Sequence, residues 1–597
     1  MKKITIICII FLLLIVNIST CFALSKENKN QYISNSDKEW TYIFYDAHDY
    51  THNWLEPMLF RPITRPRSDK NLNFIVLQDT IYGPAKIFYI NKLGRKVLKE
   101  NLGEINMGNS SSLEYIVSYC KEKYPANRYF LEIASHGTAW YASGLDETSN
   151  DDWLTMKEIQ KALKNTGGVD IIAFISSCAM ASLESVYELR EITDVYIGCE
   201  EATAFDPSVY NDIYTLIRKE TELSNIEIGK RIIQIIEEIE KNSKINFYKR
   251  DTISAMRTDR VTNLVFAIKN FTIEISKNLE GNFEDIKSVH KKTQQFFDAD
   301  LMDIYDFAKN YLDLEGLNEN LSNHLRGIID ALNETVIYEY HKDAYPGANG
   351  LTIYFPYWGG YQWFLPENYY ANFGLDFTND TYWDEFLIEY DRLFPRVDDD
   401  GTADYKKIQD AIDNCTEGDL IYVLNGTYFE NIKISKKLFL IGESSLSTKI
   451  IGNKTKDVVT INEDETKIFY LNISNSSDNG AGVKVNADYA EIRFCDIFKN
   501  NLGIYLNQTS NVKVNGNNIF KNKLGLYLLK SNKNRIMKNI FKENNKDIYF
   551  TNSVNNKWEN YYLNKPNRTI LPIIGERKFG NISIPTLRFD RHHIYLI

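Results

Sequence analysis

Two residues in the first half of the chain, a histidine and a cysteine, could supply a nucleophile and its base. His136 follows the run Leu131-Glu132-Ile133-Ala134-Ser135, and Cys178 ends the run that begins at Ile171. We expect each run to be a strand, and ligands of parallel α/β sheets bind beyond the carboxyl ends of strands. His136 and Cys178 would then face one cleft, where imidazole can accept the thiol proton. The alternative is a buried core thiol and a strand-end histidine.

The residues next to this pair could support the same chemistry. A helix beginning directly after Cys178 would lower the pKa of its thiol. Gly137 allows its backbone N–H to approach a substrate closely. The N–H groups of Gly137 and Cys178 could therefore stabilise a developing oxyanion.

Alternating strands and helices over residues 40–395 must position these groups. Apolar strand candidates are Trp40 to Tyr45, Asn73 to Leu77, Tyr129 to Ala134, Val169 to Ile175 and Val195 to Cys199. Helical patterns follow at Thr155 to Lys164, Met180 to Glu191 and Glu227 to Lys241. Apolar strands separated by helices predict an α/β domain with a largely parallel sheet, covered on both faces.

Residues 402–597 have a different pattern, rich in Asn, Ile and Gly and with little helical periodicity. Ile-Phe-Lys occurs at 497–499, 519–521 and 540–542, and Gly503, Gly525 and Asp547 recur every 22 residues. A fixed period with β-branched residues predicts a solenoid of stacked short strands. The segment from Ala403 to Tyr428 resembles the opening coil of pectin-lyase-like right-handed parallel β-helices. We therefore expect an all-β second domain of that kind.

Composition and net charge exclude some classes of protein. The 597 residues are 44% hydrophobic and 25% charged, which is typical of folded proteins and excludes wholesale disorder. The formal charge of −11 argues against nucleic acid as the main partner, because no excess of cations is available to bind phosphates.

The first residues predict export. Lys2 and Lys3 precede the apolar run Ile4 to Val16, and small residues at Cys21 and Ala23 fit a cleavage site. We interpret residues 1–23 as a signal peptide and the mature protein as secreted or surface-associated, without a transmembrane anchor. Lipid attachment at Cys21 is an alternative. The five later cysteines are widely spaced and odd in number, so they predict neither a zinc site nor a disulfide framework.

Several motifs of residues 40–395 together resemble clostripain-like cysteine peptidases. They are Tyr45 to Asp49, Gly103 to Gly108, Ser135-His136-Gly137, Ser177 to Glu184 and Gly350 to Pro356. The resemblance implies a caspase-like α/β/α sandwich with a Cys–His dyad. It implies Cys178 as nucleophile, His136 as general acid/base and the N–H groups of Gly137 and Cys178 as oxyanion hole.

The chain departs from the family pattern at two places. Family members usually carry Asp two residues before the nucleophile, associated with basic side chains at the cleavage point, but here Ser176 stands there. The remaining acidic candidates for the substrate pocket are Glu200, Glu201 and Asp206, each equally explained as a solvated loop charge. The family also tends to mature by cutting itself after a basic residue, yet residues 137–156 contain no Lys or Arg. We therefore expect no such cut.

Calcium is a trait of some family members. Asp146, Glu147, Asp151 and Asp152 form an acidic group that could bind it, although their spacing is not that of an EF-hand loop. A solvated acidic loop explains the same residues. The dyad itself needs no cofactor.

Two functions follow from these patterns. The first is a secreted cysteine endopeptidase acting on polypeptides, whose β-helix binds a surface, carbohydrate or protein. The second is a surface interaction or adhesion protein with a vestigial dyad. A polysaccharide lyase is disfavoured, because the repeats show no focus of acidic and basic residues on one coil face.

Overall fold

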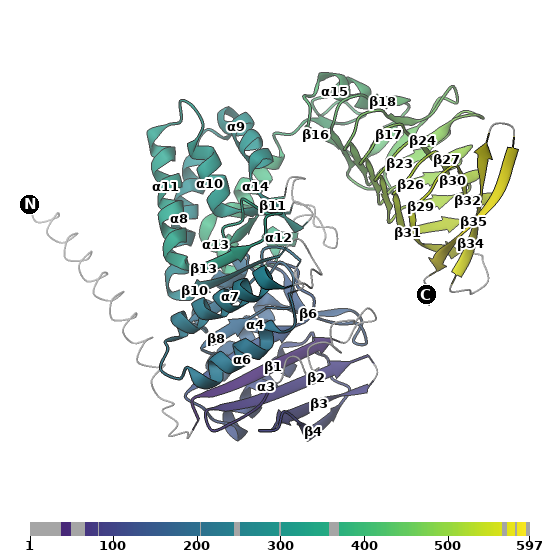
Figure 1. The fold of residues 1–597 in the computed structure, drawn as a ribbon. Coiled ribbons are helices and arrows are strands. Elements are labelled where there is room, and N and C mark those ends of the chain that lie inside the picture. Colours follow the sequence, from purple (N-terminus) through teal and green to yellow (C-terminus); the bar gives the residue numbers. More distant parts are fainter. Residues whose placement is uncertain are drawn as a thin grey trace, which may run out of the picture. The chain divides into compact units, whose positions relative to one another are not determined.

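The computed structural model describes residues 38–48, 66–81, 83–202, 205–243, 251–297, 300–356, 369–563, 570–579 and 582–592. The predicted signal peptide, residues 1–23, lies outside the described residues. The chain divides into two compact units, residues 1–391 and residues 392–597 (Figure 1). Each unit has its own hydrophobic core.

A nine-stranded sheet forms the centre of the first unit. Its order is β13-β10-β9-β8-β5-β1-β2-β3-β4, and the five strands from β9 to β2 run parallel. The prediction of a largely parallel sheet holds for this centre but is wrong at the edges, where pairing is antiparallel. The strands are β1 (Trp40–His48), β2 (Leu72–Thr80), β3 (Gly83–Ile90), β4 (Lys96–Gly103), β5 (Arg128–Ala134), β8 (Ile171–Ala173), β9 (Val195–Gly198), β10 (Thr252–Arg257) and β13 (Val336–His341).

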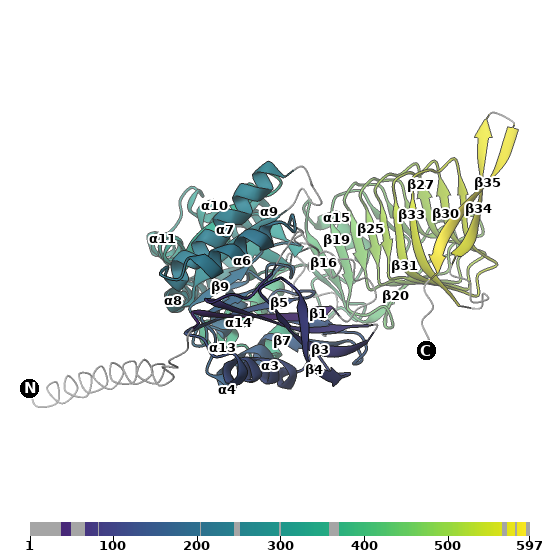
Figure 2. The ribbon, with the colours of Figure 1, turned by 60° about the horizontal axis from the view of Figure 1, so that its bottom comes forward.

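Helices cover both faces of this sheet, as predicted. On one face α6 (Val209–Lys219) and α7 (Asn225–Asn242) pack their isoleucines against aromatic residues of β1, β2 and β5. On the other lie α3 (Ser110–Lys123) and α4 (Met156–Thr166) (Figure 2). Helix α4 begins with a capping box between Thr155 and Glu158 and ends at the left-handed Gly167. The unit is thus an α/β/α sandwich.

Further elements of the first unit extend this sandwich. A three-stranded sheet is formed by β11 (Gln295–Phe296), β12 (Leu301–Asp303) and β14 (Thr352–Tyr354), and a hairpin by β6 (Ala142–Asp146) and β7 (Asp152–Thr155). The helices are α5 (Leu183–Glu188), α8 (Thr258–Ser276), α9 (Leu279–Lys292), α10 (Ile304–Leu312), α11 (Glu319–Thr335), α12 (Tyr369–Asn372), α13 (Asp376–Thr381) and α14 (Trp383–Asp391).

The second unit is a solenoid of parallel strands that ends in an antiparallel hairpin. From β16 to β27 each strand pairs with the third strand after it, so three strands complete one coil. The elements are β15 (Arg396–Val397), α15 (Ile408–Asn414), β16 (Leu420–Val423), β17 (Gly426–Tyr428), β18 (Ile432–Ile434), β19 (Phe439–Gly442), β20 (Thr448–Ile451), β21 (Val459–Ile461), β22 (Lys467–Phe469), β23 (Asn472–Ser474), β24 (Ala481–Val485), β25 (Glu491–Arg493), β26 (Asp496–Phe498), β27 (Leu502–Asn507), β28 (Lys513–Asn515), β29 (Asn518–Phe520), β30 (Leu524–Leu529), β31 (Arg535–Lys542), β32 (Lys546–Thr551), β33 (Lys557–Leu563), β34 (Ile570–Phe579) and β35 (Ile582–His592).

The coil repeat is confirmed, with one change of register. Ile504, Leu526 and Ile548 stack at intervals of 22 residues, as the glycine repeat predicted. The Ile-Phe-Lys triplet, however, slips by one residue in its third copy, because Ile519 pairs with Phe541 rather than Ile540. Phe541 is fully buried there, so the coil keeps its length and a larger side chain enters the core.

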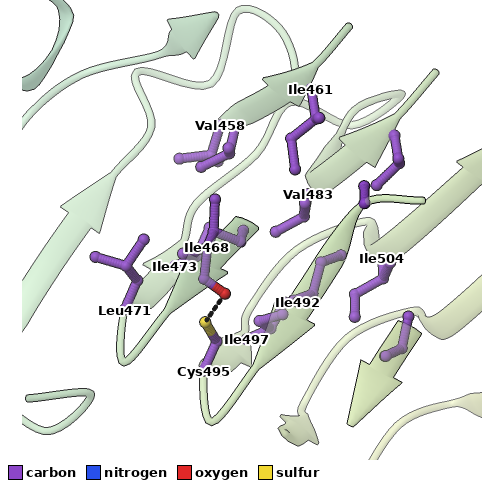
Figure 3. Close-up of a cluster of buried hydrophobic side chains, with 14 of the residues drawn as sticks. Val458, Ile461, Ile468, Leu471, Ile473, Val483, Ile492, Cys495, Ile497 and Ile504 are labelled. Atoms are coloured by element: carbon purple, nitrogen blue, oxygen red, sulfur yellow. Dashed lines mark hydrogen bonds between the residues drawn. The ribbon is translucent and has the colours of Figure 1, made fainter. Parts of the chain in front are cut away.

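Aliphatic side chains fill the solenoid. Figure 3 shows stacked isoleucines and valines around Cys495, whose Sγ lies 3.8 Å from the carbonyl oxygen of Ile468. Asparagines form ladders at the corners: the side chain of Asn522 accepts from the N–H of Asn500, and that of Asn544 from the N–H of Asn522, both at 3.0 Å. Buried amides are thereby paired from coil to coil.

Candidate active site

His136 lies two residues beyond the end of β5, in a turn that we call the histidine turn (residues 135–138). Its side chain is exposed. Its backbone carbonyl oxygen accepts hydrogen bonds from the Ser143 hydroxyl at 3.1 Å and the Gly144 N–H at 3.2 Å. The β6 hairpin therefore fixes the backbone that carries the imidazole.

Cys178 lies in a turn after β8, which we call the cysteine turn (residues 174–181), and its side chain is half-buried. The prediction that the strand runs to Cys178 and a helix follows at once is wrong. Strand β8 ends at Ala173, and α5, capped by Ser182, begins only at Leu183. Ala179 has a φ of 58°, a left-handed conformation that interrupts both strand and helix. The N-terminus of α5 therefore does not explain an activated thiol.

The two turns pack directly against each other. Strands β5 and β8 pair in parallel, with Glu132 opposite Ala173. Beyond them the Ser177 hydroxyl donates to the carbonyl oxygen of Ile133 at 3.0 Å and accepts from the N–H of Ser135 at 3.3 Å. A Cβ atom on Gly137 would lie only 2.3 Å from the carbonyl oxygen of Cys178. Glycine is required there because the two backbones approach so closely.

The cysteine turn is held from its other side by the segment after β9. The N–H of Ala179 donates to the carbonyl oxygen of Glu201 at 3.1 Å, and that of Ala181 to Cys199 at 2.8 Å. The buried Cys199 thiol donates to the carbonyl oxygen of Ser177 at 3.0 Å. The left-handed conformation of Ala179 costs about 1–2 kcal/mol of conformational free energy. These hydrogen bonds hold the turn in that conformation.

Sequence reasoning missed a buried carboxyl group on β5. Glu132 is fully buried, and its two carboxyl oxygens accept hydrogen bonds from the hydroxyls of Tyr42 and Tyr210, the latter at 2.7 Å. Burial raises the pKa of Glu132 to about 7, although both hydroxyls act to lower it. The sequence signal was a charged residue within the apolar run from Tyr129 to Ala134.

The four predicted pocket residues do not share one environment. Ser176 is half-buried beside Tyr210. Glu200 is buried beside the equally buried Asp303, and burial together with that carboxylate raises its pKa well above the usual range. Glu201 is half-buried and accepts from the N–H groups of Ala202 at 2.9 Å and Phe297 at 3.0 Å.

Asp206 stands at the start of α6. Its carboxylate accepts from the Ser243 hydroxyl at 2.6 Å and the Ser208 N–H at 2.9 Å. Burial raises the pKa of Asp206, but these hydrogen bonds outweigh burial and leave it lowered. Asp206 is therefore ionised, and its carboxylate is engaged by hydrogen bonds from Ser243 and Ser208.

Only one of the four residues expected to bind calcium belongs to a three-carboxylate group in the described part of the chain. Carboxylate oxygens of Asp79, Glu104 and Asp146 lie within 4.8 Å of one another. Asp152 instead accepts from the Asn106 side chain at 2.6 Å, and Asp151 is exposed. Three carboxylates fit the oxygen preference of Ca²⁺.

Comparison with known proteins agrees with this architecture. The model of the clostripain family matches residues 50–390, more than half of the chain. The protein belongs to the clostripain family. It is accordingly a cysteine endopeptidase that acts on polypeptides, and peptidases of this family need no cofactor for their chemistry. A second family model, periplasmic copper-binding protein (NosD), matches residues 401–581.

Individual relatives of this clostripain-family chain are distant. Clostripain of Hathewaya histolytica is 23% identical over 414 residues, which cover 56% of this chain and 76% of the relative. A solved inactive zymogen C11 protease from Parabacteroides distasonis is 20% identical, with a TM-score of 0.44, over 58% of this chain and 99% of its own. A secreted C11 cysteine protease from Bacteroides thetaiotaomicron, solved with an irreversible peptide inhibitor, is 17% identical, with a TM-score of 0.45 and the same coverage. None of the helices in the described residues has the length and apolar character needed to cross a bilayer.

Proposed function

We propose that this protein is an exported endopeptidase in which Cys178 and His136 form the catalytic dyad. The observation that carries the proposal is the direct contact between the histidine and cysteine turns at Gly137. Cys178 and His136 follow the carboxyl ends of two paired parallel strands, where ligands of such sheets bind. The family requires a nucleophilic cysteine. Cys120, Cys199, Cys415 and Cys495 are buried, whereas Cys178 is half-exposed.

The proposed reaction begins with transfer of the Cys178 thiol proton to His136. The thiolate attacks the scissile carbonyl carbon and forms a tetrahedral oxyanion. His136 then donates its proton to the leaving amine as the C–N bond breaks, leaving a thioester on Cys178. Water, deprotonated by His136, attacks the thioester, and the carboxylic acid product leaves as the proton returns to the thiolate.

The backbone supplies the oxyanion hole in this proposal. Gly137 pairs with Ser143 as an isolated bridge, in which the neighbouring N–H groups of Thr138 and Gly144 make the hydrogen bonds. No hydrogen bond from the N–H of Gly137 occurs within the described residues. In our proposal it stabilises the oxyanion, and the N–H of Cys178 is the second donor.

Around this dyad we assign three finer features to the chain. Residues 1–23 act as a signal peptide, so that the mature protein is secreted or attached to the cell surface. Residues 40–395 form a caspase-like peptidase domain, and residues 402–597 form a right-handed parallel β-helix that binds a surface or substrate. Calcium, when taken up, would be held by Asp79, Glu104 and Asp146, and no step of the reaction passes through it.

Cleavage of a diverse peptide pool tests the dyad. The mature protein is compared with Cys178→Ala and His136→Ala under reducing conditions, and Cys120→Ala serves as the matched control because its thiol is buried within α3. We expect both dyad variants to lose at least about 10³-fold in kcat/KM and the control to retain its activity. Unchanged cleavage by Cys178→Ala would assign the nucleophile elsewhere. Cleavage absent from the native protein, with Cys178 unreactive to a thiol probe, would favour a vestigial dyad.

A further inference from the structure

A polar groove crosses successive coils of the solenoid. Its volume is about 560 Å³, and every side chain that lines it is Lys, Asn, Ser, Asp or Glu. The charged members are four lysines and two carboxylates: Lys454, Lys499, Lys521, Lys523, Asp478 and Glu543. The lysines are in excess, although the whole chain has a formal charge of −11.

The coil repeat places these lysines in register. Phe498, Phe520 and Lys542 pair on neighbouring coils, so the residues that follow them, Lys499, Lys521 and Glu543, form a column along the solenoid. Adjacent coils are about 4.8 Å apart, as neighbouring strands are. The buried asparagine ladder through Asn500 and Asn522 fixes the corner beneath this column. The cations therefore project from a rigid backbone.

The charges of this groove are incompletely compensated. Lys521 lies 3.6 Å from Glu543. Lys454, Lys499 and Lys523 form no ion pair within the described residues. Like charges on neighbouring strands destabilise a sheet, and Lys499, Lys521 and Lys523 are exposed, so packing does not require them. An anionic ligand would compensate these charges.

We propose that this groove binds an anionic glycan, a chain of sugars that carries carboxylate or phosphate groups. Lysines pair with its charges, and the side-chain amides of Asn501 and Asn545 are suited to sugar hydroxyl groups. An acidic peptide fits less well, because the lining offers no apolar pocket for an anchor side chain. A single-stranded nucleic acid also fits less well, because no aromatic side chain lines the groove for base stacking.

This inference specifies the surface-binding role proposed for the second unit and does not depend on the peptidase chemistry. The test uses the full chain with Cys178→Ala, to prevent digestion during binding. Probes are a hexuronate polymer (alginate), a phosphorylated dextran, neutral dextran and a single-stranded oligonucleotide, measured by isothermal titration at low and high salt. The groove variant is Lys499→Gln/Lys521→Gln/Lys523→Gln. Its matched control is Lys530→Gln/Lys533→Gln/Lys538→Gln, which removes three exposed lysines of the same unit outside the groove.

We expect at least one anionic probe to bind, with an affinity that falls as salt rises, and dextran not to bind. The groove variant should weaken binding about tenfold or more, since three cation contacts are lost, and the control variant should change it by less than about twofold. The anionic probe that binds identifies carboxylate or phosphate as the ligand group. Equal losses in both variants, equal binding of an oligonucleotide, or no binding of either polyanion would each overturn the proposal. Peptide cleavage by the native chain is measured separately, so failure of the dyad proposal would be distinguishable.

Discussion

Replacing Gly137 with alanine should strongly reduce the activity of the enzyme, because the added methyl group has no space between the two turns. The new Cβ would lie 2.3 Å from the carbonyl oxygen of Cys178 and 2.9 Å from both Cγ and Sδ of Met180. Ordinary contact distances begin near 3.5 Å, so one turn must move by about 1 Å. The Met180 side chain can rotate away, but the Cys178 carbonyl belongs to a backbone held by Glu201 and Cys199. Hydrogen bonds from Ser143 and Gly144 hold the histidine turn as well, so the added methyl group must push the two turns, and with them His136 and Cys178, apart.

A displacement of about 1 Å in a catalytic group costs about 10²-fold in rate. Overpacking of this kind also lowers the free energy of unfolding by about 1–3 kcal/mol. We expect kcat/KM on a fluorogenic peptide to fall by about 10²-fold, and the thermal midpoint to fall by a few degrees without loss of the native fold.

The matched control is Gly327→Ala in the middle of α11. A Cβ added there meets nothing within 4 Å, so alanine should stabilise the helix by about 0.5–1 kcal/mol and leave kcat/KM unchanged. Gly137→Ala could instead retain kcat/KM within about threefold of the native value, far from the expected loss of about 10²-fold. The close approach of the two turns would then not be part of the active site. A comparable loss of activity in Gly327→Ala would refute the same reasoning.

Three further outcomes are expected. Ser176→Asp should raise kcat/KM for substrates with Arg or Lys at the cleavage point, relative to neutral ones, by about tenfold or more; an unchanged ratio would show that Ser176 does not face that side chain. Burial raises the folded pKa of Glu132 from 4.5 to about 7, so its contribution to stability is present below pH 4.5 and is lost as pH rises through 7. Denaturant titrations should therefore show Glu132→Gln gaining about 2.5 kcal/mol relative to the native protein between pH 5 and pH 8, and a difference that does not vary with pH would contradict this. Mass spectrometry of the purified protein should show no cut within residues 137–156. Two fragments that separate in this range, and that are absent from Cys178→Ala, would show self-processing.

The central strands could be predicted from the sequence because their apolar runs are uninterrupted. Trp40 to Tyr45 and Asn73 to Leu77 lie within β1 and β2, and Tyr129 to Ala134 lies within β5. The edge strands β3 and β4 were not predicted. Strand β4 is largely exposed, and its sequence Lys96 to Gly103 has no buried residue that would indicate a strand. Its position depends on pairing with β3.

The cysteine turn could not be predicted because its causes are distant in sequence. The apolar residues Phe174 and Ile175 continue the strand pattern, yet the Ser177 hydroxyl bonds back to Ile133, 44 residues earlier. Ala179 is held in its left-handed conformation by a hydrogen bond to Glu201. Local propensity favours strand and then helix, and these long-range hydrogen bonds override it.

The carboxyl groups that could replace an Asp at position 176 are already engaged within the fold, so we expect no preference for a basic side chain at the cleavage point. Tyr210 lies beside Ser176 and donates to Glu132, which already accepts two tyrosine hydroxyls and is partly neutral at pH 7 because of burial. The Glu201 carboxylate is engaged by two backbone N–H groups, and that of Asp206 by Ser208 and Ser243. A basic side chain that reached Ser176 would have to break one of these arrangements to gain an ion pair. These residues therefore do not compensate for the missing carboxylate at position 176, and the variant Ser176→Asp isolates its effect.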